Sequence, residues 1–226
     1  NIDKIHKVVE FACEGLAGVS SSLIEMNANI QFYNGMTTGE IQEVLVRSAN
    51  DLISLDAPNY QYAAARLLSY TVNKEVFGEY QSVTFEKMIE MNITRGLYDP
   101  AILEYYTSEE LATLDSYIRH KRDENFTYAG LRQVVDKYLV QDRSTNTLFE
   151  TPQFMYLMIA ATLFAQYPAE TRMHYVRRYY DATSLFKINI PTPVMAGVRT
   201  PVRQFASCVL VDADDTLDSI FASDMA

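Results

Sequence analysis

The sequence predicts a mostly α-helical chain that enters an α/β domain near its carboxyl end. In the earlier part of the chain, apolar residues recur at the three- and four-residue spacing of helices that bury one face. After Phe186 the pattern changes to KINIPTP, and Val209, Leu210 and Val211 then form an apolar run without alternation. Such a run is typical of a strand buried on both faces, as in a sheet or barrel that helices cover. The change from helical to strand spacing therefore indicates the start of an α/β domain.

The first part of the chain, up to Gly78, is expected to form helices. Asp3 can cap the first helix, Thr37 and Glu40 have the spacing of a capping box, and a third helix from about Tyr60 to Lys74 follows Pro58. The apolar stripes of the first two consist of Ile5, Val8, Val9, Ala12 and Leu16, and of Ile41, Val44, Leu45, Ala49 and Leu52.

The middle of the chain contains further helices and one hairpin. Thr107 and Glu110 repeat the capping-box spacing. Residues 138–150 read as two short strands around the polar turn DRSTN. Pro152 opens an apolar helix to about Gln166, Pro168 opens another, and Asp215 or Thr216 starts a final helix.

Composition excludes several classes of protein. The chain has 226 residues with 48% apolar content, enough for a sizeable core in one or two domains. With 19 basic and 29 acidic residues, the net charge of −10 argues against nucleic acid or an anionic membrane as partner. Cys13 and Cys208 lie far apart without a metal-ligand pattern, so no metal site is expected, and Cys13 is interpreted as a packing residue. With no signal peptide and no apolar stretch of membrane-spanning length, we expect a cytoplasmic protein.

Four segments of the chain resemble one family. They are DAPNYQYAAARLL (56–68), KYLVQDR (137–143), ETPQFMYLMIA (150–160) and PTPVMAGVRTPVRQFASCVLV (191–211). All four resemble, in the same order, the large catalytic subunit of class I ribonucleotide reductases. The last run is the most specific, because it has fixed Pro, Gly, Arg and Cys positions over many residues.

The resemblance implies three regions. Residues 1–78 are similar to the ATP-cone, a regulatory domain, without its first strands; 79–186 to the N-terminal helical domain with a small β-hairpin; and 187–226 to the start of the ten-stranded α/β catalytic barrel. The family's radical-bearing cysteine, the second cysteine of its redox pair and its tail cysteines would lie beyond Ala226. Because a barrel with most strands missing exposes unpaired edges, we expect this chain alone to be sticky, or partly unfolded beyond Phe186.

Cys208 is the main candidate for chemistry. From the residues alone, a cysteine in a buried strand is most simply a small packing residue. The resemblance instead implies one of two thiols that are oxidised to a disulfide as the ribose 2′-hydroxyl is reduced. From the residues alone, Thr192 is most simply a polar residue of a turn after Pro191, and Ser207 a polar residue of a strand. By resemblance they help to hold the substrate's diphosphate and ribose.

Two effector sites are implied by the same resemblance. Asp215, Thr216 and Leu217 match positions that bind the deoxynucleoside triphosphate controlling substrate specificity, although Asp215 is also a plain N-cap candidate. Asn1, Lys4, Thr38 and Lys74 match positions around ATP or dATP in the cone. The family's Lys-Arg pair for the phosphates would precede Asn1, which leaves ATP binding by this chain an open point.

The sequence supports two hypotheses of function. In the first, the chain is the amino-terminal part of a ribonucleoside-diphosphate reductase large subunit, active only with a complementing carboxy-terminal portion. The resemblance then implies a metal-containing small subunit that supplies the radical, thioredoxin or glutaredoxin as reductant, and a homodimer of the assembled large subunit. In the second, the chain is a regulatory module that senses nucleotides without chemistry. The intact Cys208 segment favours the first.

Overall fold

A computed structural model describes residues 2–78, 82–208 and 210–225. The described residues are mostly helical, and their strands form a single two-stranded antiparallel sheet. None of the described helices is both long and apolar enough to cross a bilayer. The elements are α1 Ile2–Cys13, α2 Ser21–Asn29, α3 Thr38–Asn50, α4 Tyr60–Phe77, α5 Phe85–Thr94, α6 Ile102–Tyr105, α7 Ser108–Asp115, the 3-10 helix η1 His120–Asn125, α8 Tyr128–Lys137, β1 Gln141–Asp142, β2 Thr147–Leu148, α9 Pro152–Leu163, α10 Ala169–Ser184, α11 Thr192–Gly197 and α12 Leu217–Met225.

Both predicted capping boxes are present. The Thr37 hydroxyl accepts from the Glu40 amide at 3.2 Å, and the Glu40 carboxylate accepts from the Thr37 amide at 2.7 Å. The same reciprocal pair joins Thr107 and Glu110, at 3.3 and 2.9 Å. These bonds satisfy amides that a helix start leaves without partners, so they fix where α3 and α7 begin.

Helix α9 is the centre of the molecule. Its residues from Pro152 to Ala161 are all buried, and α10 and η1 pack against it. The Phe154 ring lies 5.9 Å from that of Phe77 and 6.1 Å from that of Phe85, between centroids. A helix that is apolar on every side has to be covered on every side, which explains why the other helices gather around it.

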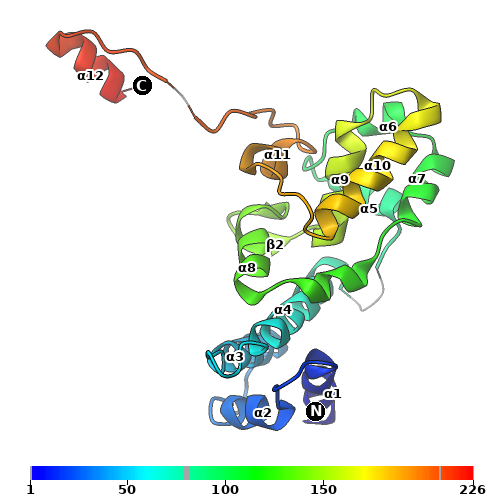
Figure 1. Ribbon diagram of the computed structural model, residues 1–226, viewed down its shortest axis with the longest axis vertical. Helices are drawn as coiled ribbons and strands as arrows, with labels where there is room; N and C mark the ends of the chain where they lie inside the picture. Colours follow the sequence, from blue (N-terminus) through cyan, green and yellow to red (C-terminus); the bar gives the residue numbers. More distant parts are fainter. Residues whose placement is uncertain (1, 79–81, 209, 226) are drawn as a thin grey trace.

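Helix α4 joins the two ends of the helical part. Helices α1 and α3 pack on it, and so do α8, β2 and η1 (Figure 1). It ends at Gly78, whose φ of 70° is the left-handed conformation of a helix C-cap. The predicted third helix is thus confirmed, and it connects the first 50 residues to the α9 core.

The predicted hairpin is confirmed as a short one. Gln141 pairs with Leu148, and Asp142 pairs with Thr147. Asn146 closes the turn with φ of 58°, a conformation that asparagine tolerates better than most residues. The hairpin places Val140 and Glu150, which flank its strands, next to each other in the interior.

The last part of the chain divides at Thr200. In residues 187–199, Ile190, Met195 and Arg199 are buried, whereas the side chains on either side of Ile190 are exposed. This part of the chain is thus anchored to the helices at three side chains. We call residues 200–225 the tail segment. It extends away from the helices and ends in α12, which buries none of its side chains (Figure 1).

The strand expected around Cys208 is not formed among the described residues. Residues 201–208 and 210–214 have no strand partner, and Cys208 and Leu210 are exposed; Val209 lies outside the described residues. A strand forms when a neighbour takes up its amides and carbonyls, and the two described strands pair with each other. The barrel implied by the resemblance is therefore not seen here.

Candidate functional site: a buried ion pair beneath the Cys208 segment

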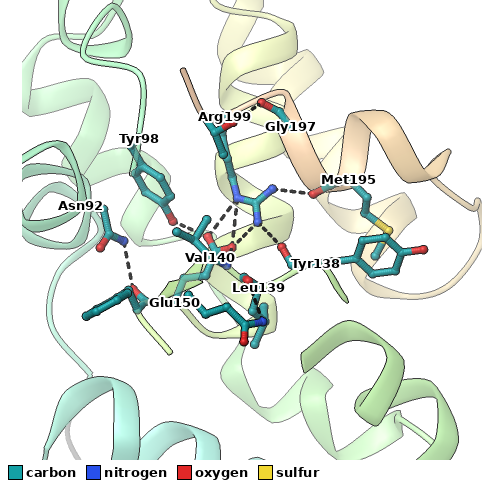
Figure 2. A network of polar contacts seen from close by, with 12 residues as sticks. Asn92, Tyr98, Tyr138, Leu139, Val140, Glu150, Met195, Gly197 and Arg199 are labelled. Atoms are coloured by element: carbon teal, nitrogen blue, oxygen red, sulfur yellow. Dashed lines mark hydrogen bonds and ion pairs between the residues drawn. The ribbon is translucent and has the colours of Figure 1, made fainter. Parts of the chain in front are cut away.

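A fully buried ion pair holds the base of the tail segment. Glu150 stands between β2 and α9, and Arg199 follows α11; both side chains have 0% exposure. The Arg199 Nε donates to the two Glu150 carboxylate oxygens at 3.1 and 3.0 Å, and its Nη2 also donates to Oε1. Figure 2 shows the guanidinium lying between helices and hairpin.

Every remaining polar atom of the pair finds a partner. The Arg199 Nη1 donates to the Met195 carbonyl at 2.6 Å and its Nη2 to the Tyr138 carbonyl at 2.7 Å. The Glu150 carboxylate accepts from the Val140 amide at 2.7 Å and from the Tyr98 hydroxyl. Two desolvated charges are tolerated only with such complete hydrogen bonding. The network therefore joins α8, the hairpin, α9 and α11 at one point.

The electrostatics of this network are set by burial. Burial, followed by the Glu150 charge, raises the pKa of Tyr98 well above its usual value. Burial acts to lower the pKa of Arg199, but the Glu150 carboxylate outweighs it and the pKa is raised. Tyr98 is thus a neutral donor and Arg199 a permanent cation, so the network is an anchor rather than a proton-transfer site.

Thr192 lies beside this anchor, at the first turn of α11. Its Oγ1 is 3.0 Å from the hydroxyl oxygen of Tyr138. Both residues line an open cleft of ≈ 1030 Å³, together with Lys187 and Asn189. The expectation of a turn after Pro191 is corrected, because residues 192–197 form a short helix.

Cys208 and Ser207 lie on the exposed tail segment. The Ser207 oxygen and the Cys208 sulfur are 3.9 Å apart, and both side chains face solvent. Within the part of the chain that the structure describes, no recorded contact joins either of them to Thr192. Thr192, Ser207 and Cys208 thus lie along one continuous segment. Arg199, between Thr192 and Ser207, holds this segment to the helical part.

The three effector candidates begin α12. The Thr216 hydroxyl accepts from the Ser219 amide at 3.2 Å. Of the two residues expected to start this helix, Asp215 and Thr216, the N-cap is therefore Thr216. Leu217 is the first helical residue and is 73% exposed. Asp215 is exposed beside them.

Comparison with known proteins identifies the family. A protein-family model described as "Ribonucleotide reductase, all-alpha domain" matches residues 124–203. Ribonucleoside-diphosphate reductase 1 subunit alpha of Salmonella typhimurium is 50% identical over 226 residues, and that of Escherichia coli is 49% identical over the same length. The alpha subunit of Enterobacteria phage T4 is 43% identical over 219 residues, 96% of this chain.

The chain belongs to the ribonucleotide reductase alpha-subunit family. All of this chain is matched by the first two relatives, and it corresponds to the amino-terminal part of those proteins. It spans 30% of their length. The resemblance stated from the four sequence segments is therefore confirmed.

The residues that the sequence analysis assigned to an ATP or dATP site are dispersed over three helices. Lys4 is exposed on α1, Thr38 is the first residue of α3, and Lys74 lies in the last turn of α4; Asn1 is outside the described residues. Since α1 and α3 both pack on α4, the three elements are neighbours. In the described ranges, no hydrogen bond or ion pair links the three side chains to one another.

Sequence reasoning did not single out Glu150, Arg199 or Tyr138. Glu150 and Arg199 both belong to segments that carried the reductase resemblance, and each follows an apolar residue. A charged residue is almost never fully buried unless it is paired, so a charge beside apolar residues was the available signal. Which partner it takes could not be read from spacing, because the two residues are 49 positions apart.

Proposed function

We propose that this chain is the amino-terminal part of a ribonucleoside-diphosphate reductase large subunit, which converts ribonucleoside diphosphates to deoxyribonucleoside diphosphates for DNA synthesis. The observation that carries the proposal is the near-half identity to named alpha subunits over the whole chain. Since those proteins are more than three times longer, activity requires a complementing carboxy-terminal portion, in the same polypeptide or in another. The functional unit is a cytoplasmic homodimer of the assembled large subunit.

Cys208 is one of the two thiols of the reaction. The ribose 2′-hydroxyl leaves as water and is replaced by hydrogen, while the Cys208 thiol and a second thiol from the carboxy-terminal portion are oxidised to a disulfide. Thioredoxin or glutaredoxin then reduces this disulfide by thiol exchange. A separate, metal-containing small subunit supplies the radical that starts each turnover.

Cys208 is a free thiol on the tail segment, as exchange with an external reductant requires. Thr192 and Ser207 hold the substrate's diphosphate and ribose through their hydroxyls. The buried pair of Glu150 and Arg199 fixes the segment between them on the helical part.

The remaining candidate residues bind effectors. Asp215, Thr216 and Leu217 bind the deoxynucleoside triphosphate that sets substrate preference, at the start of α12. Lys4, Thr38 and Lys74, with Asn1, contribute to an ATP or dATP site of the cone. These nucleotides are the only ligands proposed for the chain besides the substrate.

Replacing the two cysteines separately tests the proposal. The chain is assembled with the carboxy-terminal portion and the small subunit, and deoxynucleoside diphosphate formation is followed with thioredoxin as reductant. We expect Cys208→Ser to abolish multiple turnover. Cys13→Ser is the matched control, because Cys13 is half-buried, its burial raises its pKa to about 11, and it should be inert.

Each outcome decides between the two hypotheses of function. Loss of turnover in the Cys208 variant alone supports the reductase. Unchanged turnover would contradict the redox role of Cys208. Nucleotide binding by the assembled protein without any diphosphate reduction would favour the regulatory module instead.

A further inference from the structure

Tyr138 contacts both ends of α11. Its hydroxyl lies 3.0 Å from Thr192 Oγ1 at the first turn, and its carbonyl accepts from Arg199 Nη2 at 2.7 Å just past the last turn. One residue at the carboxyl end of α8 thus contacts the chain at both ends of α11. Figure 2 shows the ring of Tyr138 beside Met195, on the α11 side of the network.

The Tyr138 side chain has little freedom to move. The residue is only 9% exposed, and its amide donates to the Val134 carbonyl at 2.9 Å. Main chain and ring are therefore both held, and the hydroxyl is presented at a fixed point of the cleft that Thr192 also lines. A donor held in this way is preorganised, so using it costs little conformational entropy.

We propose that Tyr138 is a positioning residue that orients the Thr192 hydroxyl toward a substrate phosphate. The inference rests on the proposed function, in which Thr192 holds the diphosphate. A phosphate oxygen accepts hydrogen bonds, so the Thr192 hydroxyl has to donate to it, and its oxygen then needs another donor. Tyr138 is that donor: its hydroxyl donates to Thr192, and Thr192 donates to the phosphate. In such a chain each hydrogen bond polarises and strengthens the next.

Substrate kinetics of single and double variants test this arrangement. The large subunit containing this segment, assembled with its small subunit, is assayed with cytidine diphosphate as the probe. We expect Tyr138→Phe to raise KM about 3- to 10-fold while kcat changes less than about twofold, as for the loss of one hydrogen bond that binds rather than reacts. Thr192→Val should raise KM at least as much.

The double variant separates positioning from a general structural effect. If Tyr138 acts through Thr192, the variant with both substitutions has the KM of Thr192→Val alone. Multiplication of the two effects, or an unchanged KM in Tyr138→Phe, would overturn the inference.

Tyr106→Phe is the matched control. The Tyr106 hydroxyl is also buried and donates to the Ala161 carbonyl at 2.8 Å, in a different part of the core. Its loss should lower the melting temperature about as much as Tyr138→Phe and leave KM unchanged; an equal rise in KM would overturn the inference. If the unsubstituted enzyme does not reduce cytidine diphosphate at all, the proposed function fails and the inference falls with it.

Discussion

Arg199 and Arg203 are four residues apart, yet they lie in opposite surroundings. The Arg199 side chain is fully buried and bonded to three residues, whereas the Arg203 side chain is 64% exposed and pairs with Asp99. The helices before Arg199 share a buried core, although some of their apolar side chains, such as Ile30 and Leu55, are exposed. Beyond Arg203, Leu210, Leu217 and Phe221 face solvent, and α12 buries none of its side chains. The tail segment therefore lacks a core of its own, and another surface is needed to cover its apolar side chains.

The largest expected effect comes from breaking the buried pair. Glu150→Ala leaves the buried Arg199 charge without a counter-charge and removes the carboxylate that accepts from the Val140 amide and the Tyr98 hydroxyl, so we expect a loss of about 3–5 kcal/mol in the free energy of unfolding. Urea denaturation measures it. Arg203→Ala is the control, because exposed ion pairs contribute about 1 kcal/mol or less. Equal losses in both variants would remove the contrast between the two regions.

Limited proteolysis with trypsin compares the two arginines directly. The protease has to receive the arginine side chain in its specificity pocket, and Arg199 can enter only after its buried network opens. We expect cleavage after Arg203 to be faster than after Arg199 by on the order of 100-fold, set by the free energy of local opening. Mass spectrometry of the fragments gives both cleavage rates. The ratio of these rates in urea, where the buried network is open, corrects for the sequence preference of trypsin.

The pH dependence of stability sharpens the comparison within the helical part. Burial raises the pKa of Asp123 from 3.8 to about 7, and its Oδ1 accepts from Gln153 Nε2 at 2.7 Å. The folded state favours the protonated carboxyl of Asp123. Its contribution to the free energy of unfolding is therefore complete below about pH 4 and is lost as the pH rises through about 7. Asp123→Asn keeps an acceptor and cannot ionise.

We therefore expect Asp123→Asn to gain stability over the unsubstituted chain between pH 4 and pH 7, with an upper bound of roughly 4 kcal/mol. Urea denaturation at several pH values measures the difference. Asp215→Asn, in the tail segment, is the control for losing one exposed carboxylate. A pH-independent difference for Asp123→Asn would mean that its carboxyl is not held protonated by the fold.

The smallest expected effect concerns helix caps. Thr107→Ala removes the acceptor for the Glu110 amide at the start of α7, which should cost about 1 kcal/mol of global stability. Thr216→Ala removes the matching bond at the start of α12. Because α12 buries no side chain, its loss should lower helical circular dichroism without changing the unfolding midpoint. A shifted midpoint in Thr216→Ala would show that α12 packs on the rest of the chain.

Local signals predicted the helices whose ends are marked in the sequence. Thr37, Thr107 and Pro152 mark starts that the structure confirms, since a cap acts on amides within three residues. Helix α11 was expected as a turn, because its prolines and Gly197 indicate one locally. Its formation depends on Arg199 and Met195 docking into the interior, which is a tertiary effect.

The candidate site was predictable only where a family pattern covered it. The resemblance pointed to Thr192, Ser207 and Cys208, whose roles remain predictions. The resemblance included Tyr138 in the segment 137–143 but implied no role for it. Its two contacts at α11 join positions more than 50 residues apart, which sequence spacing does not reveal. The buried strand around Cys208 was wrong for the described chain, since strand pairing depends on neighbours and not on the apolar run itself.

The buried pair also constrains the order of events during synthesis. A ribosome completes Glu150 and all of α9 before it reaches Arg199, 49 residues later. Until then the carboxylate has no cation to accompany it into the interior, so the nascent helices cannot close around it at full strength. Arg199 is therefore the last residue to join this buried network, and nascent chains in which Arg199 has left the ribosome should resist protease more than chains that end before it.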